Sequence, residues 1–160
     1  MRWFWIQFVI FQALWLVAII GGNAWLALAI ALLAIHFIAT PSRQQDWRVL
    51  PIALIGIAVD TALTLGGVFQ FEQVPFWLGL LWVAFVLTLG HSLAWLRQLP
   101  QVALFPIGAL AGVVSYLAGW RLGAVELPLG LTITTIALGA VWALLLPTLV
   151  TLDRKIRRIV

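Results

Sequence analysis

The stretch LPLGLTITTIALGAVWALLLPTLVTL, residues Leu127 to Leu152, contains no charged residue and is followed directly by the basic sequence DRKIRR. A helix that crosses a bilayer needs about 20 consecutive apolar residues, so this stretch is long enough. A cluster of Lys and Arg at the end of an apolar run is typical of the cytoplasmic flank of a membrane helix. The sequence therefore predicts a transmembrane helix that ends at the cytoplasmic surface.

The composition of the whole chain extends this prediction. Hydrophobic residues make up 64% of the 160 residues and charged residues only 9%, whereas soluble domains are about half apolar and about a quarter charged. A soluble domain of this size could not bury so much apolar surface. The chain has no cysteine, which excludes disulfides, thiolate metal sites and cysteine nucleophiles.

Apolar runs recur along the whole chain and are separated by short segments rich in charge, Gly or Pro. They cover Trp3–Ile20, Ala24–Ala39, Val49–Phe69, Phe76–Trp95, Val102–Trp120 and Leu127–Leu152. Because lipid tolerates no unpaired backbone groups, each run is expected to be a helix. We predict an all-α fold, a single domain over residues 1–160 built as a polytopic bundle of six transmembrane helices.

The distribution of Lys and Arg predicts how this bundle is oriented. If the helices alternate in direction, one side of the membrane holds Arg2, Arg43, Arg48, Arg97, Arg154, Lys155, Arg157 and Arg158. The other side holds only Arg121, together with Glu72 and Glu126. The positive-inside rule then places both termini in the cytoplasm. The net charge of +4 is explained by the basic tail facing anionic lipid, and no nucleic-acid partner is expected.

Asp60 is the one acid that lies well inside an apolar run. At ~1.5 Å per residue it would lie about 16 Å from the cytoplasmic start of its helix, near the middle of the bilayer. Such a residue should face the interior of the bundle. Gly56 and Thr64 share its helical face. Asp60 is either a proton-linked or ligand-binding carboxyl, or a partner in an interhelical hydrogen bond, for example with Gln12.

Polar residues on other helices complete the candidate site. The run Phe76–Trp95 contains His91 and Ser92 near its cytoplasmic end, and Tyr116 could point its hydroxyl inward. His36 is expected at a depth similar to that of His91, where two imidazoles could bind haem or a metal. No third ligand is evident, so we expect neither a metal nor another cofactor. The candidate ligand-binding or polar-core residues are Asp60, His91, Ser92, Gln12, Thr64 and Tyr116.

Two stretches of the chain resemble a known family. GVFQFEQVPFWLGLLWVAFVLTLGHSLAWL, from Gly67 to Leu96, and ALAGVVSYLAGWRLGAVEL, from Ala109 to Leu127, are similar to small bacterial inner-membrane proteins catalogued as domain of unknown function 2878. The resemblance implies a multi-pass protein of the bacterial inner membrane. It also implies a link to fatty-acid or phospholipid modification, because genes of the family tend to lie beside genes for such enzymes.

Three functions remain open from the sequence. The first is a non-enzymatic component that binds or presents a lipid or lipophilic ligand, with membrane lipids and a membrane protein or lipid-modifying enzyme as partners. The second is a small transporter, or a substrate-binding transporter subunit, with Asp60 in its site. The third is an intramembrane enzyme that uses Asp60 and His91 as acid and base. No hydrolase, nucleotide-binding or metalloprotease motif is present, which disfavours the third.

Overall fold

The computed structural model describes residues 2–158 of the chain, and its elements are helices. The α-helices are α1 (Arg2–Gly21), α2 (Leu26–Ala39), α3 (Arg43–Val49), α4 (Ala53–Leu65), α5 (Phe76–Thr88), α6 (Gln101–Arg121) and α7 (Gly130–Arg158). Short 3-10 helices are η1 (Gly22–Trp25), η2 (Leu50–Ile52) and η3 (Ala94–Gln98). The predicted all-α fold is confirmed.

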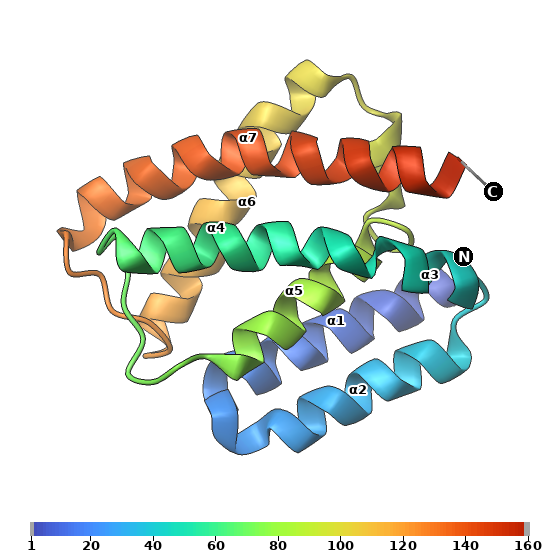
Figure 1. The fold of residues 1–160 in the computed structure, drawn as a ribbon, viewed down its shortest axis with the longest axis horizontal. Helices are drawn as coiled ribbons and strands as arrows, with labels where there is room; N and C mark the ends of the chain where they lie inside the picture. The colour runs from blue at the N-terminus through green and yellow to red at the C-terminus, as the bar shows by residue number, and fades with distance from the viewer. Residues whose placement is uncertain (1, 159–160) are drawn as a thin grey trace.

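Four helical segments are long and apolar enough to cross a membrane. They are Arg2–Ala39, Arg43–Leu65, Gln101–Arg121 and Gly130–Arg158, and Phe76–Thr88 is a shorter apolar helix. The first of these segments is a hairpin, because α1 and α2 run in opposite directions on either side of η1 (Figure 1). Gly22 begins η1 with a φ of 51°, a conformation that glycine adopts without steric cost. These apolar helices support the interpretation that the chain is a membrane protein.

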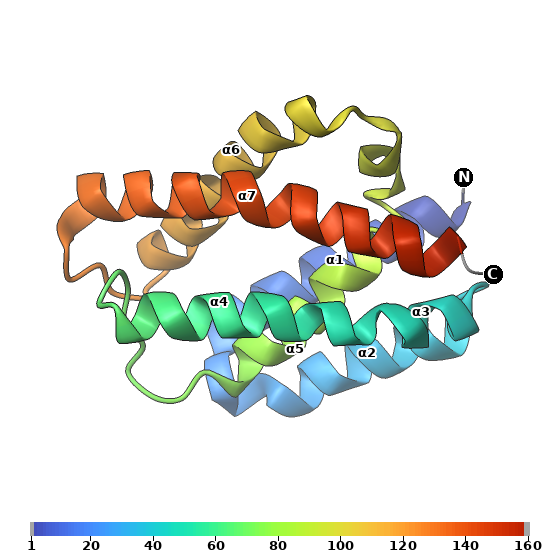
Figure 2. The ribbon, with the colours of Figure 1, turned by 45° about the horizontal axis from the view of Figure 1, so that its top comes forward.

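Helices α6 and α7, which cross in Figure 2, pack against each other more extensively than any other helix pair in residues 2–158. Glycines of α6 make this approach possible. A Cβ atom on Gly112 would lie 2.1 Å from Cγ of Trp142, and one on Gly108 would lie 2.3 Å from the Trp142 carbonyl oxygen. The small residues of this helix therefore serve close packing.

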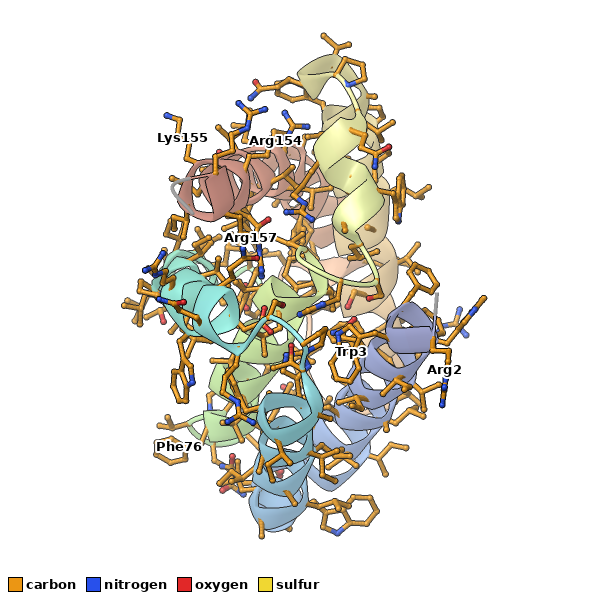
Figure 3. The ribbon with its side chains drawn as sticks, turned by 90° about the vertical axis from the view of Figure 1, so that its right-hand side faces the viewer. Arg2, Trp3, Phe76, Arg154, Lys155 and Arg157 are labelled. Carbon is orange, nitrogen blue, oxygen red and sulfur yellow. The ribbon has the colours of Figure 1, made fainter. Side chains whose placement is uncertain are left out.

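Basic residues gather at one end of the bundle, which we call the basic end. The N-terminus of α1, helix α3 and the C-terminus of α7 meet there (Figure 1). Viewed from this side, Arg2 and Lys155 point outward and Arg157 points inward (Figure 3). At the opposite end, which we call the far end, two backbone hydrogen bonds join Gln70 and Glu126.

Two predicted boundaries are wrong. The run Phe76–Trp95 is not one helix, because α5 ends at Thr88 and a turn follows before η3. Gly90 in this turn lies against Arg157, and a Cβ atom there would be 2.2 Å from Nη2 of that side chain. The turn therefore lies where the Arg157 guanidinium packs against the backbone. The connection between the runs Ala24–Ala39 and Val49–Phe69, which the sequence left outside its predicted helices, is largely occupied by α3.

Candidate functional site

Asp60 lies on α4 in the interior of the bundle, with 2% of its surface exposed. Its Oδ2 accepts a hydrogen bond of 2.6 Å from the indole Nε1 of Trp82 on α5. Its Oδ1 accepts a hydrogen bond from the hydroxyl of Tyr116 on α6. The carboxyl group thus connects three helices, as expected for an acid that must find polar partners away from water.

Close packing fixes the position of the Trp82 donor. The Trp82 ring stacks on Trp142 of α7 with 5.4 Å between centroids and 14° between planes. On its other side it lies against Gly56, where a Cβ atom would be 2.2 Å from Cε3 of the indole. Gly56 is one turn of α4 before Asp60, so the same face of the helix accommodates the indole ring and accepts its hydrogen bond.

A pocket of about 490 Å³ lies beside Asp60, between α4, the segment 66–75 and the start of α5. We call it the lateral pocket. Asp60 and Thr64 contribute polar groups to its wall. Its other lining residues are Ile57, Thr61, Leu65, Phe71, Gln73, Val74, Pro75, Phe76, Leu78 and Gly79. Leu65 and Phe76 are exposed, so the pocket opens on the outer surface of the bundle.

A second pocket, of about 70 Å³, has a wall made mainly of aromatic and aliphatic side chains. We call it the aromatic pocket. Trp82 and Tyr116, the two donors to Asp60, both line it. Phe71 and Leu78 line both pockets. The hydrogen-bonded group of Asp60, Trp82 and Tyr116 therefore separates a larger outer pocket from a small apolar one.

A second polar cluster lies at the basic end and centres on Asp46 of α3, which is fully buried. Its Oδ2 accepts a hydrogen bond of 2.5 Å from the hydroxyl of Thr40. Its Oδ1 accepts one of 3.1 Å from Nη2 of Arg157. Nε2 of His91 lies 3.0 Å from both carboxylate oxygens. So many donors favour the ionised carboxylate.

The contacts of His91 define its tautomer when the ring is neutral. Nδ1 accepts a hydrogen bond of 2.9 Å from the indole Nε1 of Trp3, and an indole nitrogen can only donate. The proton of a neutral His91 therefore lies on Nε2 and is donated to Asp46. His36 of α2 completes the cluster, with its ring centroid 5.3 Å from that of His91.

Arg157 connects this cluster to a second buried acid. Its Nε donates a hydrogen bond of 2.8 Å to Oδ1 of Asp153, one turn earlier on α7. Asp153 is fully buried, and Nη1 of Arg97 lies 3.7 Å from its Oδ2. The basic end therefore encloses two buried carboxylates and a guanidinium that contacts both of them.

The predicted site residues divide between these places. Asp60 and Tyr116 are hydrogen-bonded to each other, and Thr64 lines the lateral pocket with Asp60. His91 belongs to the Asp46 cluster and lines neither the lateral nor the aromatic pocket. The side chain of Ser92 donates to Oε1 of Gln7 on α1.

Gln12 does not have the position that a partner of Asp60 would need. It lies on the exposed face of α1, whereas the donors to Asp60 are Trp82 and Tyr116. The suggested Gln12–Asp60 hydrogen bond is therefore wrong. The turn after Thr88 also means that His91 is not on a helix continuous with α5, as the predicted helix Phe76–Trp95 would have it.

Sequence reasoning missed Asp46 and Asp153 as parts of a buried cluster. Asp46 stands in a short polar connection and Asp153 in the basic tail, where acids are usually solvated. One available signal was the position of both acids on the side that holds eight of the nine basic residues. Acids in such a place have cations within reach.

The fold and the two clusters define a helical membrane protein with a polar interior held between apolar helices. The model of the family described as "Protein of unknown function (DUF2878)" matches residues 4–148. The chain belongs to this family, and the resemblance seen in the sequence is confirmed. No curated protein matches the chain, and no solved structure does.

Proposed function

We propose that this protein crosses the bacterial inner membrane six times, with its basic end in the cytoplasm, and binds a lipophilic ligand in the lateral pocket. The observation that carries the binding proposal is the position of Asp60 in the wall of that pocket. Most of the wall is apolar, and ligand pockets of this kind orient their ligands through a few polar groups.

The polar groups of the pocket indicate the chemistry of the ligand. A carboxylate oxygen accepts hydrogen bonds, and the hydroxyl of Thr64 can donate or accept. Trp82 and Tyr116 each occupy one oxygen of Asp60, but a carboxylate has about four acceptor sites. A ligand with an apolar body and a hydroxyl or amine group near one end would complement this wall.

The opening of the pocket supports entry from the bilayer. Exposed apolar side chains form its rim, among them Leu65, Val74 and Phe76. In a membrane these side chains would contact acyl chains, so a lipid-soluble molecule could reach Asp60 without crossing the bundle. A role in presenting such a molecule to a lipid-modifying enzyme agrees with the link that the family resemblance implies.

The alternatives have less support. A transporter site of the expected kind would bring Asp60, His91 and Tyr116 to one cavity, but His91 lies in the Asp46 cluster. An acid–base pair of Asp60 and His91 has the same difficulty, because each side chain has other partners. Binding and presentation need only the lateral pocket, and for this reason we favour them.

The test is mass spectrometry of small molecules bound to the full chain, purified in detergent after exposure to a total lipid extract. Asp60→Asn and Thr64→Val alter the polar wall, and Thr148→Val is the matched control. The Thr148 hydroxyl is exposed and bonds to the Leu144 carbonyl of its own helix.

We expect a ligand with a hydroxyl or amine group to be retained by the wild type and by Thr148→Val. Retention should fall by about tenfold in Asp60→Asn, since one hydrogen bond to a charged group accounts for about that factor. Equal lipid content in all variants, or nothing beyond the bulk annular lipid in the wild type, would overturn the proposal.

A further inference from the structure

The Asp46 cluster contains three side chains with the spacing of metal ligands, and it is separate from the lateral pocket. We propose that His36, Asp46 and His91 bind a divalent transition-metal ion of the zinc type. One ligand atom of each residue can be chosen so that all three lie within 4.8 Å of one another. The residues come from α2, from α3 and from the turn after α5.

The distances between these atoms fit a cation placed among them. Nε2 of His91 is 3.0 Å from Oδ2 of Asp46, and Nε2 of His36 is 3.5 Å from the same oxygen. Ligand atoms around a tetrahedral zinc ion, with bonds of about 2.0–2.1 Å, are about 3.4 Å apart. Both distances to Oδ2 are within a few tenths of an ångström of this spacing.

The two oxygens of Asp46 have different surroundings. Oδ2 lies near both imidazoles and accepts the Thr40 hydrogen bond. Oδ1 is also 3.0 Å from Nε2 of His91, and it alone accepts the hydrogen bond from Arg157. A carboxylate that binds a metal through one oxygen commonly accepts a hydrogen bond on the other, which fixes its orientation. Arg157 therefore has the position of a residue that supports a ligand.

His36 supplies an independent observation. Its side chain is 1% exposed, and Nε2 has no hydrogen-bond partner among residues 2–158. A buried nitrogen without a partner is unfavourable, and this one is 3.5 Å from a carboxylate oxygen. A cation bound between Nε2 of His36 and Oδ2 of Asp46 would give the nitrogen a partner.

The hydrogen bond from Trp3 to His91 predicts how a Trp3 substitution changes metal binding. The Trp3 N–H holds the neutral ring with its proton on Nε2, and a metal bound at Nε2 requires that proton to move to Nδ1. Two N–H groups would then face each other, so Trp3 must turn away when the metal binds. Trp3→Phe removes this competing hydrogen bond and should tighten metal binding.

The ligand set selects the class of ion. Two imidazoles and one carboxylate suit zinc and its first-row neighbours better than magnesium or calcium, which prefer oxygen ligands. Co²⁺ is a useful probe, because it replaces Zn²⁺ with similar geometry and absorbs visible light. The full chain, purified without a histidine tag and treated with chelator, would be titrated with Co²⁺ and then with Zn²⁺ in competition.

We expect one Co²⁺ per chain, displaced by Zn²⁺. His36→Gln should weaken binding by more than about tenfold, since loss of even a supporting partner costs about 10–100-fold. Trp3→Phe should strengthen it by roughly three- to tenfold. Glu72→Gln, at the far end, is the control and should bind as the wild type does. A folded His36→Gln variant with wild-type affinity would overturn the proposal.

X-ray absorption of the zinc-loaded wild type tests the site without any variant. The chain contains only two histidines, so a metal with two imidazole ligands must be bound by His36 and His91 together. Fewer than two imidazoles per zinc, or no stoichiometric binding of either metal, would contradict the site.

Discussion

Arg157 donates a hydrogen bond of 3.1 Å from Nη2 to Oδ1 of the fully buried Asp46. The same guanidinium contacts Asp153 through Nε at 2.8 Å. One cation therefore neutralises part of the charge of two carboxylates that have no contact with solvent. The last helix is held in this way against the segment that links the second and fourth helices.

Loss of this cation should destabilise the protein strongly. In Arg157→Gln both carboxylates lose their shared charged partner, and breaking a buried pair typically costs about 3–5 kcal/mol. The measurement is the free energy of unfolding in detergent. Arg158→Gln is the control, because Arg158 is exposed at the neighbouring position and should change stability by less than about 0.5 kcal/mol. Equal stability of the two variants would show that the Arg157 contacts contribute little.

The packing of Trp82 against Gly56 gives a second prediction. The added methyl group of Gly56→Ala would lie 2.2 Å from the indole ring, so either α4 or Trp82 must move. Overpacking of this kind costs about 1–3 kcal/mol. The displaced indole should also lose its hydrogen bond to Asp60, with an accompanying change in Trp fluorescence.

Gly139→Ala is the matched control for this substitution. The nearest atom to its added methyl group is Cγ2 of Val113 at 3.6 Å, which is ordinary contact. Removing a glycine from a helix interior should then stabilise the protein by about 0.5–1 kcal/mol. Opposite signs for the two glycines are expected, and a stabilising Gly56→Ala would show that the α4–α5 contact is looser than the structure indicates.

The sequence predicted the apolar helices because their signal is local. A run of about 20 apolar residues can satisfy its backbone only as a helix in lipid, whatever its neighbours are. The burial of Asp60 was predictable for the same reason, since an acid inside such a run must avoid the acyl chains. Its partners were not, because the choice of Trp82 and Tyr116 over Gln12 depends on how each helix is rotated.

The Asp46 cluster could not be predicted for a related reason. Its members come from α2, α3, the turn after α5 and α7, and no local pattern joins them. Helical spacing also continues unbroken from Thr88 to Trp95, which made one long helix the natural prediction. The turn coincides instead with a tertiary contact, that of Gly90 with Arg157, which no local pattern shows.

The indole N–H of Trp82 should matter more than that of its stacking partner. Trp82→Phe removes the hydrogen bond to Asp60, and hydrogen bonds to charged groups contribute about 1.5–3 kcal/mol. Trp142→Phe also puts a smaller ring into the stacked pair of Trp82 and Trp142, but Nε1 of Trp142 has no hydrogen-bond partner within residues 2–158. The free energies of unfolding of the two variants should therefore differ by about this amount. An equal loss of stability would mean that only the ring stacking matters.

The proposed six crossings, with the basic end in the cytoplasm, predict an alternating pattern of chemical access. Because the chain has no cysteine, single cysteines can be introduced without background. Exposed positions that alternate between the two ends are Ala24, Gln44, Glu72, Gln98, Glu126 and Arg158. A membrane-impermeant maleimide should label Ala24→Cys, Glu72→Cys and Glu126→Cys when the outer face of the membrane is open to the reagent. The other three should react only after the membrane is permeabilised.

The pattern distinguishes the orientation of the bundle from the number of crossings. Complete reversal of the labelling would keep the six crossings but place the basic end outside, against the bias of eight basic residues to one. A single position that breaks the alternation would show that one hairpin enters the bilayer and returns to the same side.

This test bears most directly on α5, because the 13 residues of Phe76–Thr88 span only about 20 Å at 1.5 Å per residue. That length is shorter than the ~30 Å hydrocarbon core, so α5 can cross only if the turn after Thr88 and η3 complete the passage. Labelling of Gln98→Cys without permeabilisation would show that they do not.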